Sequence, residues 1–349
     1  MMPSSSPTLH ADSAPTIAPE VPKGDAQTPM RARRTNLWMD LTKARLNGLV
    51  LVTAAVGFLL ADPRTIDWGR LAWMLLGTGL AAASAAMLNQ LLERRRDALM
   101  PRTADRPLPS GRITGLPVFV LGIVAAYAGV AVLAYGTTLL ASALALLNIL
   151  LYVLIYTPLK PRTTLNTLVG AVCGAIPPMI GWAAVTGRAE PGAWALGAIL
   201  FVWQIPHFLA LAWMYREDYR LGGMNMLSVV DPDGEITSRV MVVSSLMLVP
   251  LGLTLTLGGV AGWWSAIVNA MLAVGMAVMA WRFYLNRSDA VARQAFFASI
   301  IYLPVVMAVL VLDRGPVTTE AWLRSGRESV SEAPALPAEL DTAAQGPLP

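Results

Sequence analysis

Charged residues are scarce in this chain. Asp, Glu, Lys and Arg make up 14% of its 349 residues, whereas about a quarter of an ordinary soluble protein is charged. Hydrophobic residues make up 55%. Water is therefore not the main solvent of this protein, and most of the chain is predicted to lie in a membrane.

Cysteine and histidine are scarce as well. The single cysteine, Cys173, lies in an apolar segment, so neither a disulfide framework nor a cysteine metal site is available. Of the two histidines, His10 falls in a polar segment and is assigned no role. The sequence also lacks a phosphate-cradling glycine loop, a hydrolase nucleophile elbow and a metalloprotease histidine pair. The sites of those common enzyme classes are therefore missing.

Long apolar runs, in contrast, recur from Leu46 to Leu312. Each is long enough for the roughly 20 residues that a helix needs to cross a bilayer core. They predict an all-α fold, a polytopic bundle of about nine transmembrane helices. The predicted spans lie near residues 44–62, 71–93, 115–135, 137–157, 165–186, 192–213, 240–259, 262–283 and 294–312.

Polar segments flank this region and set the domain boundaries. Residues 1–35 contain no apolar stretch suited to a signal sequence, so we expect a disordered cytoplasmic tail. Residues 36–313 form the predicted transmembrane domain. Residues 314–349 turn polar again and predict a second disordered tail.

The basic residues are distributed unevenly between the two ends of the spans. With a cytoplasmic N-terminus and nine spans, 20 of the 26 Lys and Arg residues fall on the inside and six on the outside. This bias matches the positive-inside rule and predicts a multi-pass protein of a bacterial inner membrane, with its C-terminus on the outer face. It also explains the basic net charge without nucleic acid, which we do not expect as a partner.

A strip of oxygen-bearing side chains is predicted at the end of the second span. Residues four apart drift by only about 40° around an α-helix, so Asn89, Glu93 and Asp97 share one edge. Two acids at this spacing repel each other, so we expect a cation on the strip. Mg²⁺ binds such oxygens and is often held by few protein ligands plus substrate phosphates. Alternatively, Arg94 and Arg96 supply the charge and the helix end is merely solvated.

An arginine-rich loop follows the strip. Arg102, Arg106 and Arg112 alternate there with prolines. Guanidinium groups match phosphate oxygens in geometry, and prolines restrict where they point. A loop of this kind beside a carboxylate strip suits a metal-bridged diphosphate. Alternatively, the arginines reflect only the positive-inside bias.

Two further cytoplasmic loops have a similar character. The first offers Lys160 and Arg162 to an anionic ligand, and the second contains Arg216 with the acids Glu217 and Asp218. Asp218, with Glu217 beside it, is the candidate for another metal-facing acid. Three inside loops are therefore expected to converge on one site.

His207 lies within an apolar span, next to Pro206. One interpretation is structural, because proline frees a backbone carbonyl that the histidine can bond. The alternative is contact with an acceptor substrate, including axial ligation of a haem iron.

From Asn36 to Asp313 the sequence resembles the UbiA superfamily of membrane prenyltransferases, and within it the haem-modifying branch. The motifs that carry the resemblance are Asn89-x-x-x-Glu93-x-x-x-Asp97, the loop from Arg102 to Arg112, Tyr156-Thr157-Pro158-Leu159-Lys160, Gly174-Ala175-Ile176-Pro177-Pro178, Trp203-Gln204-Ile205-Pro206-His207-Phe208 and Arg216-Glu217-Asp218-Tyr219. The first and third belong to the whole superfamily, whereas the others are more diagnostic of the haem branch.

The resemblance implies nine helices around a central cavity that opens to lipid, and an enzyme that transfers the farnesyl group of farnesyl diphosphate to a vinyl group of haem b. Water then completes the side chain, which gives haem O for terminal oxidases. It implies Mg²⁺ as cofactor, membrane lipid as surroundings, and haem A synthase or oxidase-assembly proteins as the expected protein partners.

The resemblance also distributes roles over the candidate residues. The expected catalytic residues are Asn89, Glu93, Asp97, Lys160 and Asp218, and of these all but Lys160 are expected metal ligands. Diphosphate binding is expected at Arg102, Arg106, Arg112, Lys160, Arg162 and Arg216. His207 and Trp203 are the candidate haem contacts.

Some positions depart from the family pattern. Glu93 stands where Asp is frequent, which keeps the carboxylate but lengthens its reach. Met214 and Gly222 occupy the positions four residues either side of Asp218, so the second acidic motif is reduced. Pro161 replaces a residue that is often basic.

Two rival functions remain at this level. One is prenylation of an aromatic quinone precursor, for which a second full acidic motif would be expected. The other is a haem carrier or transporter without chemistry. A transporter would have polar groups across the whole bilayer, whereas the charges here crowd on one side.

Overall fold

The computed structural model describes residues 36–62 and 65–315. The predicted tail 1–35 and residues 316–349 of the second predicted tail lie outside the described residues.

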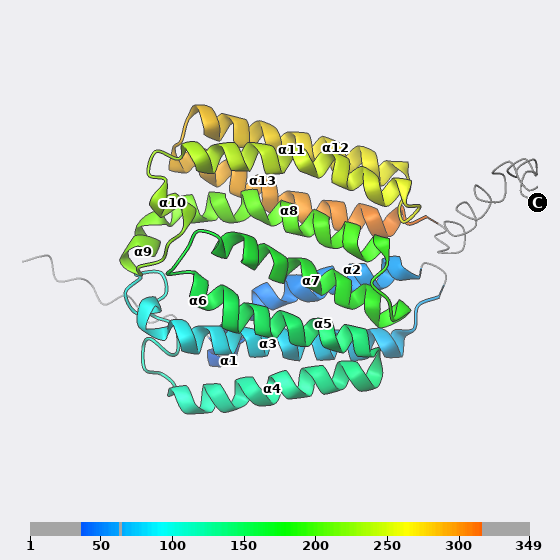
Figure 1. Ribbon diagram of the computed structural model, residues 1–349, viewed down its shortest axis with the longest axis horizontal. Helices are drawn as coiled ribbons and strands as arrows, with labels where there is room; N and C mark the ends of the chain where they lie inside the picture. Colours follow the sequence, from blue (N-terminus) through cyan, green and yellow to red (C-terminus); the bar gives the residue numbers. More distant parts are fainter. Residues whose placement is uncertain (1–35, 63–64, 316–349) are drawn as a thin grey trace, which may run out of the picture. The chain divides into compact units, whose positions relative to one another are not determined.

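Nine helices within the described part are long and apolar enough to cross a membrane, as expected, and no strand occurs there. One span is built from three consecutive pieces, α5, the π-helix η1 and α6 (Figure 1). The spanning elements are α2 (Ala44–Ala61), α3 (Trp68–Asp97), α4 (Gly115–Gly136), α5 (Leu139–Leu150) with η1 (Leu151–Tyr156) and α6 (Thr157–Leu159), α7 (Asn166–Thr186), α8 (Pro191–Met214), α11 (Glu235–Leu257), α12 (Trp263–Leu285) and α13 (Asp289–Leu312).

Several helices extend beyond the apolar windows that predicted them. α3 continues to Asp97 rather than 93, α11 begins at Glu235 rather than 240, and α13 begins at Asp289 rather than 294. Acids are favourable in the first turn of a helix and basic residues in the last, where they complement the helix dipole. The apolar stretches mark only the part of each helix that crosses the bilayer core, and the helices continue beyond it.

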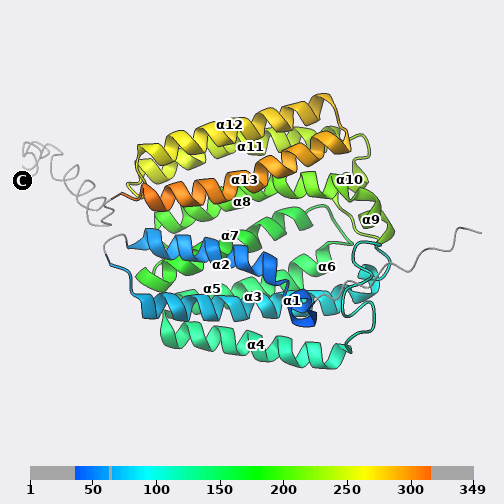
Figure 2. The same cartoon turned by 180° about the vertical axis from the view of Figure 1, so that it is seen from behind.

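α7 and α8 lie at the centre of the bundle and bury the largest share of their residues. α7 packs against α2 and α5, while α8 packs against α11 and α13 (Figures 1 and 2). α3 and α4 form one edge of the bundle, and α12 covers the opposite edge. The core therefore runs along the α7–α8 pair.

Glycines allow the central helices to approach closely. A Cβ added at Gly57 of α2 would lie 2.0 Å from the carbonyl oxygen of Pro178 in α7. On the other edge, a Cβ at Gly129 of α4 would lie 2.8 Å from the carbonyl oxygen of Gly77 in α3. Small residues at such crossings are typical of helix packing in lipid.

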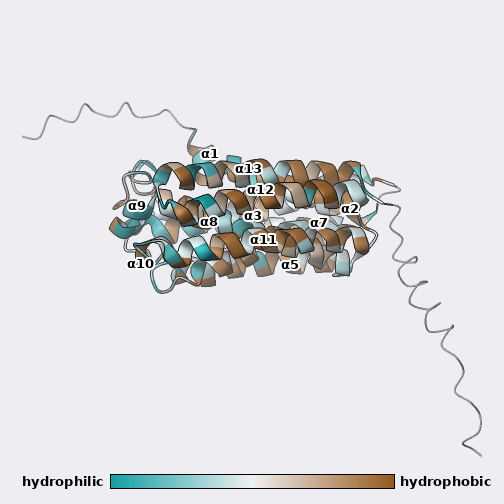
Figure 3. Ribbon diagram, turned by 90° about the horizontal axis from the view of Figure 1, so that it is seen from above, coloured by the Kyte–Doolittle hydropathy of each residue, from teal (hydrophilic) through white to brown (hydrophobic). Residues whose placement is uncertain are grey.

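The polar loops gather at one end of the bundle (Figure 3). The loop 98–114 follows α3, residues 160–165 follow α6, and the short helices α9 (Arg216–Leu221) and α10 (Leu227–Val230) follow α8. Hydrogen bonds tie these loops together. Asn225 donates its backbone N–H to the carbonyl of Lys160, and Arg96 donates to the carbonyls of Gly222 and Gly223. The predicted convergence of the three loops is present in the fold.

Candidate active site

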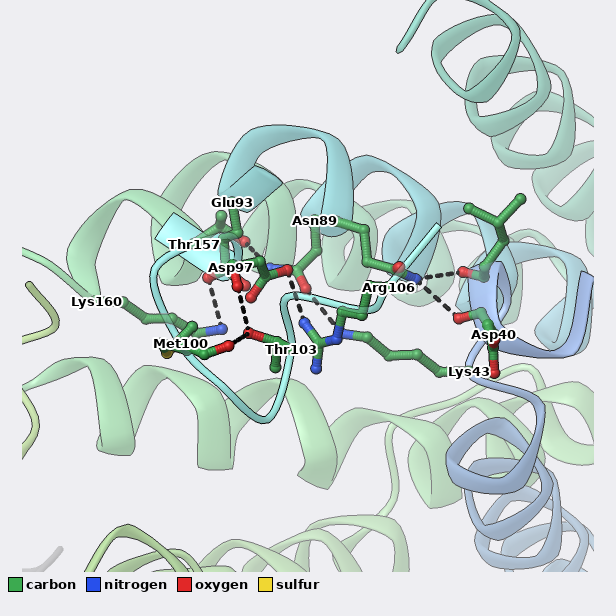
Figure 4. Close-up of polar contacts among 12 residues, drawn as sticks. Asp40, Lys43, Asn89, Glu93, Asp97, Met100, Thr103, Arg106, Thr157 and Lys160 are labelled. Carbon is green, nitrogen blue, oxygen red and sulfur yellow. Dashed lines mark hydrogen bonds and ion pairs between the residues drawn. The ribbon is translucent and has the colours of Figure 1, made fainter. Parts of the chain in front are cut away.

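The last turns of α3 carry the oxygen-lined strip that the spacing predicts. Asn89, Glu93 and Asp97 are all buried, with 0%, 5% and 1% of their surface exposed. The three side chains lie along one edge of the helix (Figure 4). Two carboxylates and an amide oxygen therefore face the interior at the polar end of the bundle.

Each residue of the strip contacts one cation. Lys43 Nζ donates to Asn89 Oδ1 at 2.8 Å. Lys160 Nζ lies 2.7 Å from Glu93 Oε1, and Arg106 lies 2.8 Å from Asp97 Oδ2 (Figure 4). Buried acids without such partners would be strongly destabilising. Three segments far apart in the sequence thus supply the charge on the strip.

The alternative in which Arg94 and Arg96 neutralise the strip does not hold. Arg96 instead donates to the backbone carbonyls of Gly222 and Gly223. The side chain of Arg94 lies near Gly115, at the start of α4. Both arginines extend away from the edge that carries the carboxylates.

Lys43 occupies a tight turn between α1 (Leu37–Leu41) and α2. Its φ of 48° makes it the one non-glycine residue with positive φ in the described part of the chain. A left-handed backbone is unfavourable for a lysine and persists when the surroundings hold it. Gln90 of α3 contributes to this, because its Nε2 donates to the carbonyls of Asp40 and Leu41. The turn is thereby fixed against the strip.

The amide of Asn89 is held in one orientation. Its Nδ2 donates to Thr157 Oγ1 at 2.9 Å, and Thr157 Oγ1 donates to the carbonyl of Tyr152 at 2.8 Å. The oxygen Oδ1 is consequently the atom that faces Lys43 and the interior. An oxygen fixed in this way is suited to a cationic ligand.

The loop 98–114 places Arg106 by local hydrogen bonds. Thr103 Oγ1 donates to the carbonyl of Asp97 at 2.8 Å and is buried there. Ser110 Oγ donates to the carbonyl of Arg106 at 2.6 Å. The loop therefore folds back on the end of α3, which brings the guanidinium of Arg106 to the strip.

The electrostatics of the site follow from its burial. The pKa of Lys43 is lowered to about 7, mainly by burial and also by the positive charges of Arg106 and Lys160, while the negative charges of Glu93 and Asp97 act in the opposite direction. Burial also lowers the pKa of Lys160, but the adjacent Glu93 carboxylate outweighs this effect and raises it above its ordinary value. Lys160 is a permanent cation, whereas Lys43 depends on its neighbours.

The remaining predicted residues lie around this core. Arg102 Nε is 3.7 Å from Asp218 Oδ2, and its guanidinium stacks over the ring of Tyr215. Glu217 pairs with Arg220 at the exposed surface, so it does not face the strip. Asp218 is thus paired with Arg102, which belongs to the same loop as Arg106.

Three predicted diphosphate ligands lie further out. Arg112 lies 3.7 Å from Asp40 Oδ2, and Arg162 is exposed. Arg216 pairs with Asp289 of α13 at 2.5 Å. These three arginines do not contact the strip, and of the six predicted ligands only Arg106 and Lys160 do.

A cavity of about 270 Å³ extends from the site into the bundle. Its lining includes Lys43 and Tyr156 at the polar end and His207 on α8, among side chains that are mostly apolar. Helices α2, α3, α5, α7, α8 and α13 all contribute to it. The charged cluster therefore sits at one end of an apolar chamber.

His207 is held between two aromatic rings at this chamber. Its ring stacks on Trp203 at 5.0 Å and on Phe296 at 4.8 Å between centroids. Its Nδ1 lies 2.8 Å from Ser299 Oγ on α13. The proposed bond to a carbonyl freed by Pro206 is therefore not formed, since the partner is a side chain of another helix.

Comparison with known proteins identifies the family. A family model described as the UbiA prenyltransferase family matches residues 50–301. The chain belongs to the UbiA prenyltransferase family.

Relatives in this family are similar over most of the chain. A protein of Solibacter usitatus named protoheme IX farnesyltransferase is 38% identical over 286 residues, which cover 79% of this chain and 98% of the relative. A protein of the same name from Anaeromyxobacter is 43% identical over 273 residues, which cover 78% and 91%. A solved UbiA homologue of Archaeoglobus fulgidus, bound to DMAPP and Mg²⁺, shares the fold with a TM-score of 0.59 at 17% identity, over 79% and 99% of the two chains.

The oxygen donors of the strip decide whether this UbiA family member can hold a metal ion there. The described residues contain no group of three or more His, Cys, Asp or Glu residues that could hold one. Glu93, Asp97 and the amide oxygen of Asn89 nevertheless form a buried set of hard oxygen donors. Mg²⁺ needs few protein ligands when water and substrate phosphates complete its shell. The residues present fit such an ion together with a diphosphate.

Some residues of this site are not evident from the sequence. From the sequence, Lys43 is one of the basic residues that the positive-inside bias explains, yet its side chain contacts Asn89, 46 positions away in sequence. Thr157 lies within a recognised motif, but its bond to Asn89 is a tertiary contact. One sequence signal does point to Lys43, because it lies directly before the apolar span that begins at Ala44. A lysine at that position can extend its side chain along the end of the helix bundle.

Proposed function

We propose that this chain transfers the farnesyl group of farnesyl diphosphate to a vinyl group of haem b, which gives haem O. The observation that carries the proposal is a cluster of three buried acceptor residues, each paired with a cation, in which Lys43 also lines an apolar cavity that reaches His207. The relatives named protoheme IX farnesyltransferase support the choice of substrates.

The polar end is the binding site for the diphosphate. Asn89, Glu93 and Asp97 would hold Mg²⁺, which neutralises charge on the leaving group when it is bound. When the oxygens of the strip bind the ion, they no longer pair with the three cations that they contact in this structure. Lys43, Lys160 and Arg106 then become available to the phosphate oxygens, and charge-assisted hydrogen bonds of this kind are strong. We call the strip and its three cations the clamp. In the absence of substrate, the oxygens of the strip occupy the positions next to the cations that phosphate oxygens are proposed to take.

The outer cations complete the proposed diphosphate site. Arg102 is anchored by Asp218 and by the ring of Tyr215, so its guanidinium has a defined position. Arg112, Arg162 and Arg216 lie at the rim and attract the anionic donor. Asp218 is proposed as an additional acid of this site, one step removed from the strip.

The chemistry requires no protein nucleophile. The carbon–oxygen bond of the allylic donor ionises, and Lys43, Lys160 and Arg106 stabilise the charge that develops on the diphosphate. The apolar cavity shields the allylic cation from bulk water until the vinyl group of the haem attacks it. Burial of the clamp strengthens each of these interactions, because the local dielectric constant is low.

The haem is proposed to bind on the α8 side of the cavity. His207 lies there with its Nδ1 engaged by Ser299, which leaves Nε2 as the nitrogen for an axial contact. Trp203 is fixed by the bond from its Nε1 to the carbonyl of Ser299 at 2.8 Å, and it offers a flat apolar face. The cavity volume of about 270 Å³ lies at the lower end of the range for small-molecule sites, roughly 300–1,000 Å³. A cavity of this size suits a narrow prenyl chain better than a whole haem. Part of the macrocycle would therefore lie towards the lipid.

Prenylation of an aromatic quinone precursor is less well supported. The second acidic motif expected of such an enzyme is incomplete, because Met214 and Gly222 flank Asp218 at the relevant spacing. Glu217, the nearest other acid, pairs with Arg220 at the surface.

Haems extracted from cells test the proposal. Cells of a bacterial host that lacks its own enzyme should retain haem B but contain no haem O, and expression of this chain should restore haem O, detected by mass spectrometry. Asp97→Asn removes a charge but keeps the size of the side chain, so we expect no haem O while the protein remains in the membrane. Normal haem O formation by this variant would refute the role of the strip, and no haem O with the unaltered chain would refute the function.

A further inference from the structure

The hydroxyl oxygen of Ser299, on α13, makes two short contacts. Oγ lies 2.6 Å from the backbone carbonyl oxygen of Phe296, one turn earlier in the same helix, and 2.8 Å from Nδ1 of His207 on α8. The side chain of Ser299 is fully buried, with 0% of its surface exposed. Bulk water therefore does not compete for either contact.

A count of protons assigns the donor in each contact. Each hydrogen bond needs one proton between its two heavy atoms, and a hydroxyl group supplies one whereas a carbonyl supplies none. The carbonyl of Phe296 can only accept, so that bond uses the proton of Ser299. The proton of the second bond must then come from His207, whose Nδ1 donates to Ser299 Oγ. With the proton on Nε2 instead, one of the two short contacts would bring two lone pairs together.

The surroundings keep the ring of His207 neutral. It stacks on the rings of Trp203 and Phe296, and no acid pairs with it in the described part of the chain. A charged imidazole without an acid partner would be costly within a membrane span. A neutral ring carries a proton on one nitrogen and a lone pair on the other. Because the proton is on Nδ1, the lone pair is on Nε2.

We infer that Ser299 is a positioning residue, which holds His207 in the tautomer that presents an unprotonated nitrogen to haem iron. This use of the nitrogen rests on the proposed function. His207 lines the cavity, and its Nε2 has no hydrogen-bond partner among the described residues. Nε2 is also not one of the buried unpaired atoms, so a ligand can reach it. Iron binds the lone pair of a neutral imidazole, and a hydrogen bond from the other nitrogen makes that lone pair more basic.

Ser299 holds the neighbouring aromatic ring by a separate bond. Trp203 Nε1 donates to the backbone carbonyl of Ser299, which keeps the indole stacked on His207. The backbone of Ser299 thus fixes Trp203, and its hydroxyl group fixes the tautomer of His207. A substitution of the side chain removes only the second contact, so the two effects can be separated.

Other side chains of the cavity are less suited to bind the iron. Cys173, Tyr152 and Tyr156 also line it, but such groups ligate iron as anions. Each would first have to lose a proton in a mostly apolar chamber, where a charge is costly. His207 with its proton on Nδ1 can ligate without any change of charge.

The tautomer can be measured directly, because the chain contains only two histidines. The full-length protein with His10→Gln and ¹⁵N-labelled histidine has a single labelled ring, and ¹⁵N chemical shifts distinguish protonated from unprotonated ring nitrogens. In lipid nanodiscs without haem, we expect the proton on Nδ1. Ser299→Ala should move the proton wholly or partly to Nε2, because Nδ1 then has no acceptor whereas Nε2 is accessible.

Ser245→Ala in α11 is the matched control. The side chain of Ser245 is also fully buried, and its hydroxyl group donates to the carbonyl of Met241 in the same helix. Loss of this hydroxyl group should leave the proton of His207 on Nδ1.

Haem binding provides the second readout. Ferric haem b is titrated into the same nanodiscs, and histidine ligation is followed by the Soret band and by electron paramagnetic resonance. Groups that hydrogen-bond to a metal-ligating histidine are typically worth 10–100-fold in affinity. The Kd should therefore rise about ten- to a hundredfold in Ser299→Ala and stay unchanged in Ser245→Ala. In a His207→Ala background, Ser299→Ala should have no further effect, because Ser299 acts through His207.

The outcomes separate this inference from the proposed function. A proton on Nε2 while Ser299 is intact overturns the inference, and this measurement needs no serine variant to fold. A proton that stays on Nδ1 in Ser299→Ala overturns it as well, and so does an equal loss of haem binding with and without His207. Absence of haem O from a protein that shows the expected tautomer and haem ligation would instead overturn the proposed function.

Discussion

Glu93 and Asp97 can be buried because each is paired with a cation from another segment of the chain. Glu93 and Asp97 repel each other along α3, yet Lys160 and Arg106 reach them from two different loops. A buried ion pair contributes little net stability, but removal of one partner leaves an uncompensated charge. The arrangement is therefore better understood as preparation for an anionic ligand than as a device for stability.

Lys43 offers a test at the residue scale. Lys43→Met removes the cation that faces Asn89, and we expect kcat/KM for farnesyl diphosphate to fall about ten- to a hundredfold, since hydrogen bonds to charged groups are worth roughly 1.5–3 kcal/mol. Steady-state kinetics of the purified variant measure this. Arg45→Met is the control, because it loses the same charge two residues away at an exposed position. Equal losses in both variants would show that activity depends on the total positive charge of this region and not on a cation at position 43.

Residue spacing predicts the strip but not its partners. The four-residue intervals place Asn89, Glu93 and Asp97 on one edge of α3, and burial bears this out. Lys43 and Thr157 reach the strip through folding of distant segments, which no local pattern encodes. The same limit applies to Arg216, whose pairing with Asp289 depends on how α9 meets α13.

At the scale of elements, hydropathy locates the helices and misplaces some of their ends. α3 continues four residues beyond the apolar window that ends at 93, so Asp97, the last residue of the strip, lies in a turn that hydropathy excludes. The π-helix η1 is a second such feature. π-helical turns are rare and occur frequently at functional sites. Its position in the span could not be predicted, because the apolar pattern Leu151–Tyr156 is equally compatible with an α-helix.

The crossing of α2 and α7 gives a prediction about an element. Gly57→Ala places a Cβ 2.0 Å from the carbonyl oxygen of Pro178, which is backbone and cannot rotate away. We expect a loss of about 1–3 kcal/mol of stability, seen as a lower melting temperature in detergent and a lower yield of monodisperse protein. Gly48→Ala lies on the same helix with nothing within 4 Å of the added Cβ and serves as the control. Similar stability of the two variants would contradict the close contact.

At the scale of the whole molecule, composition and charge bias predict the transmembrane architecture. The number of spans and the gathering of polar loops at one end follow from hydropathy and from the 20 basic residues assigned to that side. The cavity does not follow from the sequence, since its walls come from six helices that are remote in the chain. The pairing of each acid with a separate cation does not follow from the sequence either.

We propose that the polar loops face the cytoplasm, as the positive-inside rule requires. Single cysteines in a Cys173→Ala background test this with a membrane-impermeant thiol reagent on intact bacteria. We expect labelling of Arg188→Cys, which is exposed in the turn between α7 and α8, and labelling of Ser110→Cys in the loop 98–114 only after permeabilisation. The reverse pattern would place the active site on the outer face.

The central claim is that the clamp activates a prenyl diphosphate for transfer to haem. The most direct measurement is the conversion of haem b to its farnesylated product by the purified protein with farnesyl diphosphate, followed by mass spectrometry with and without a chelator. We expect a farnesylated haem that is formed only when Mg²⁺ is present and that Asp97→Asn does not form. Equal product from the chelated enzyme or from Asp97→Asn would contradict it.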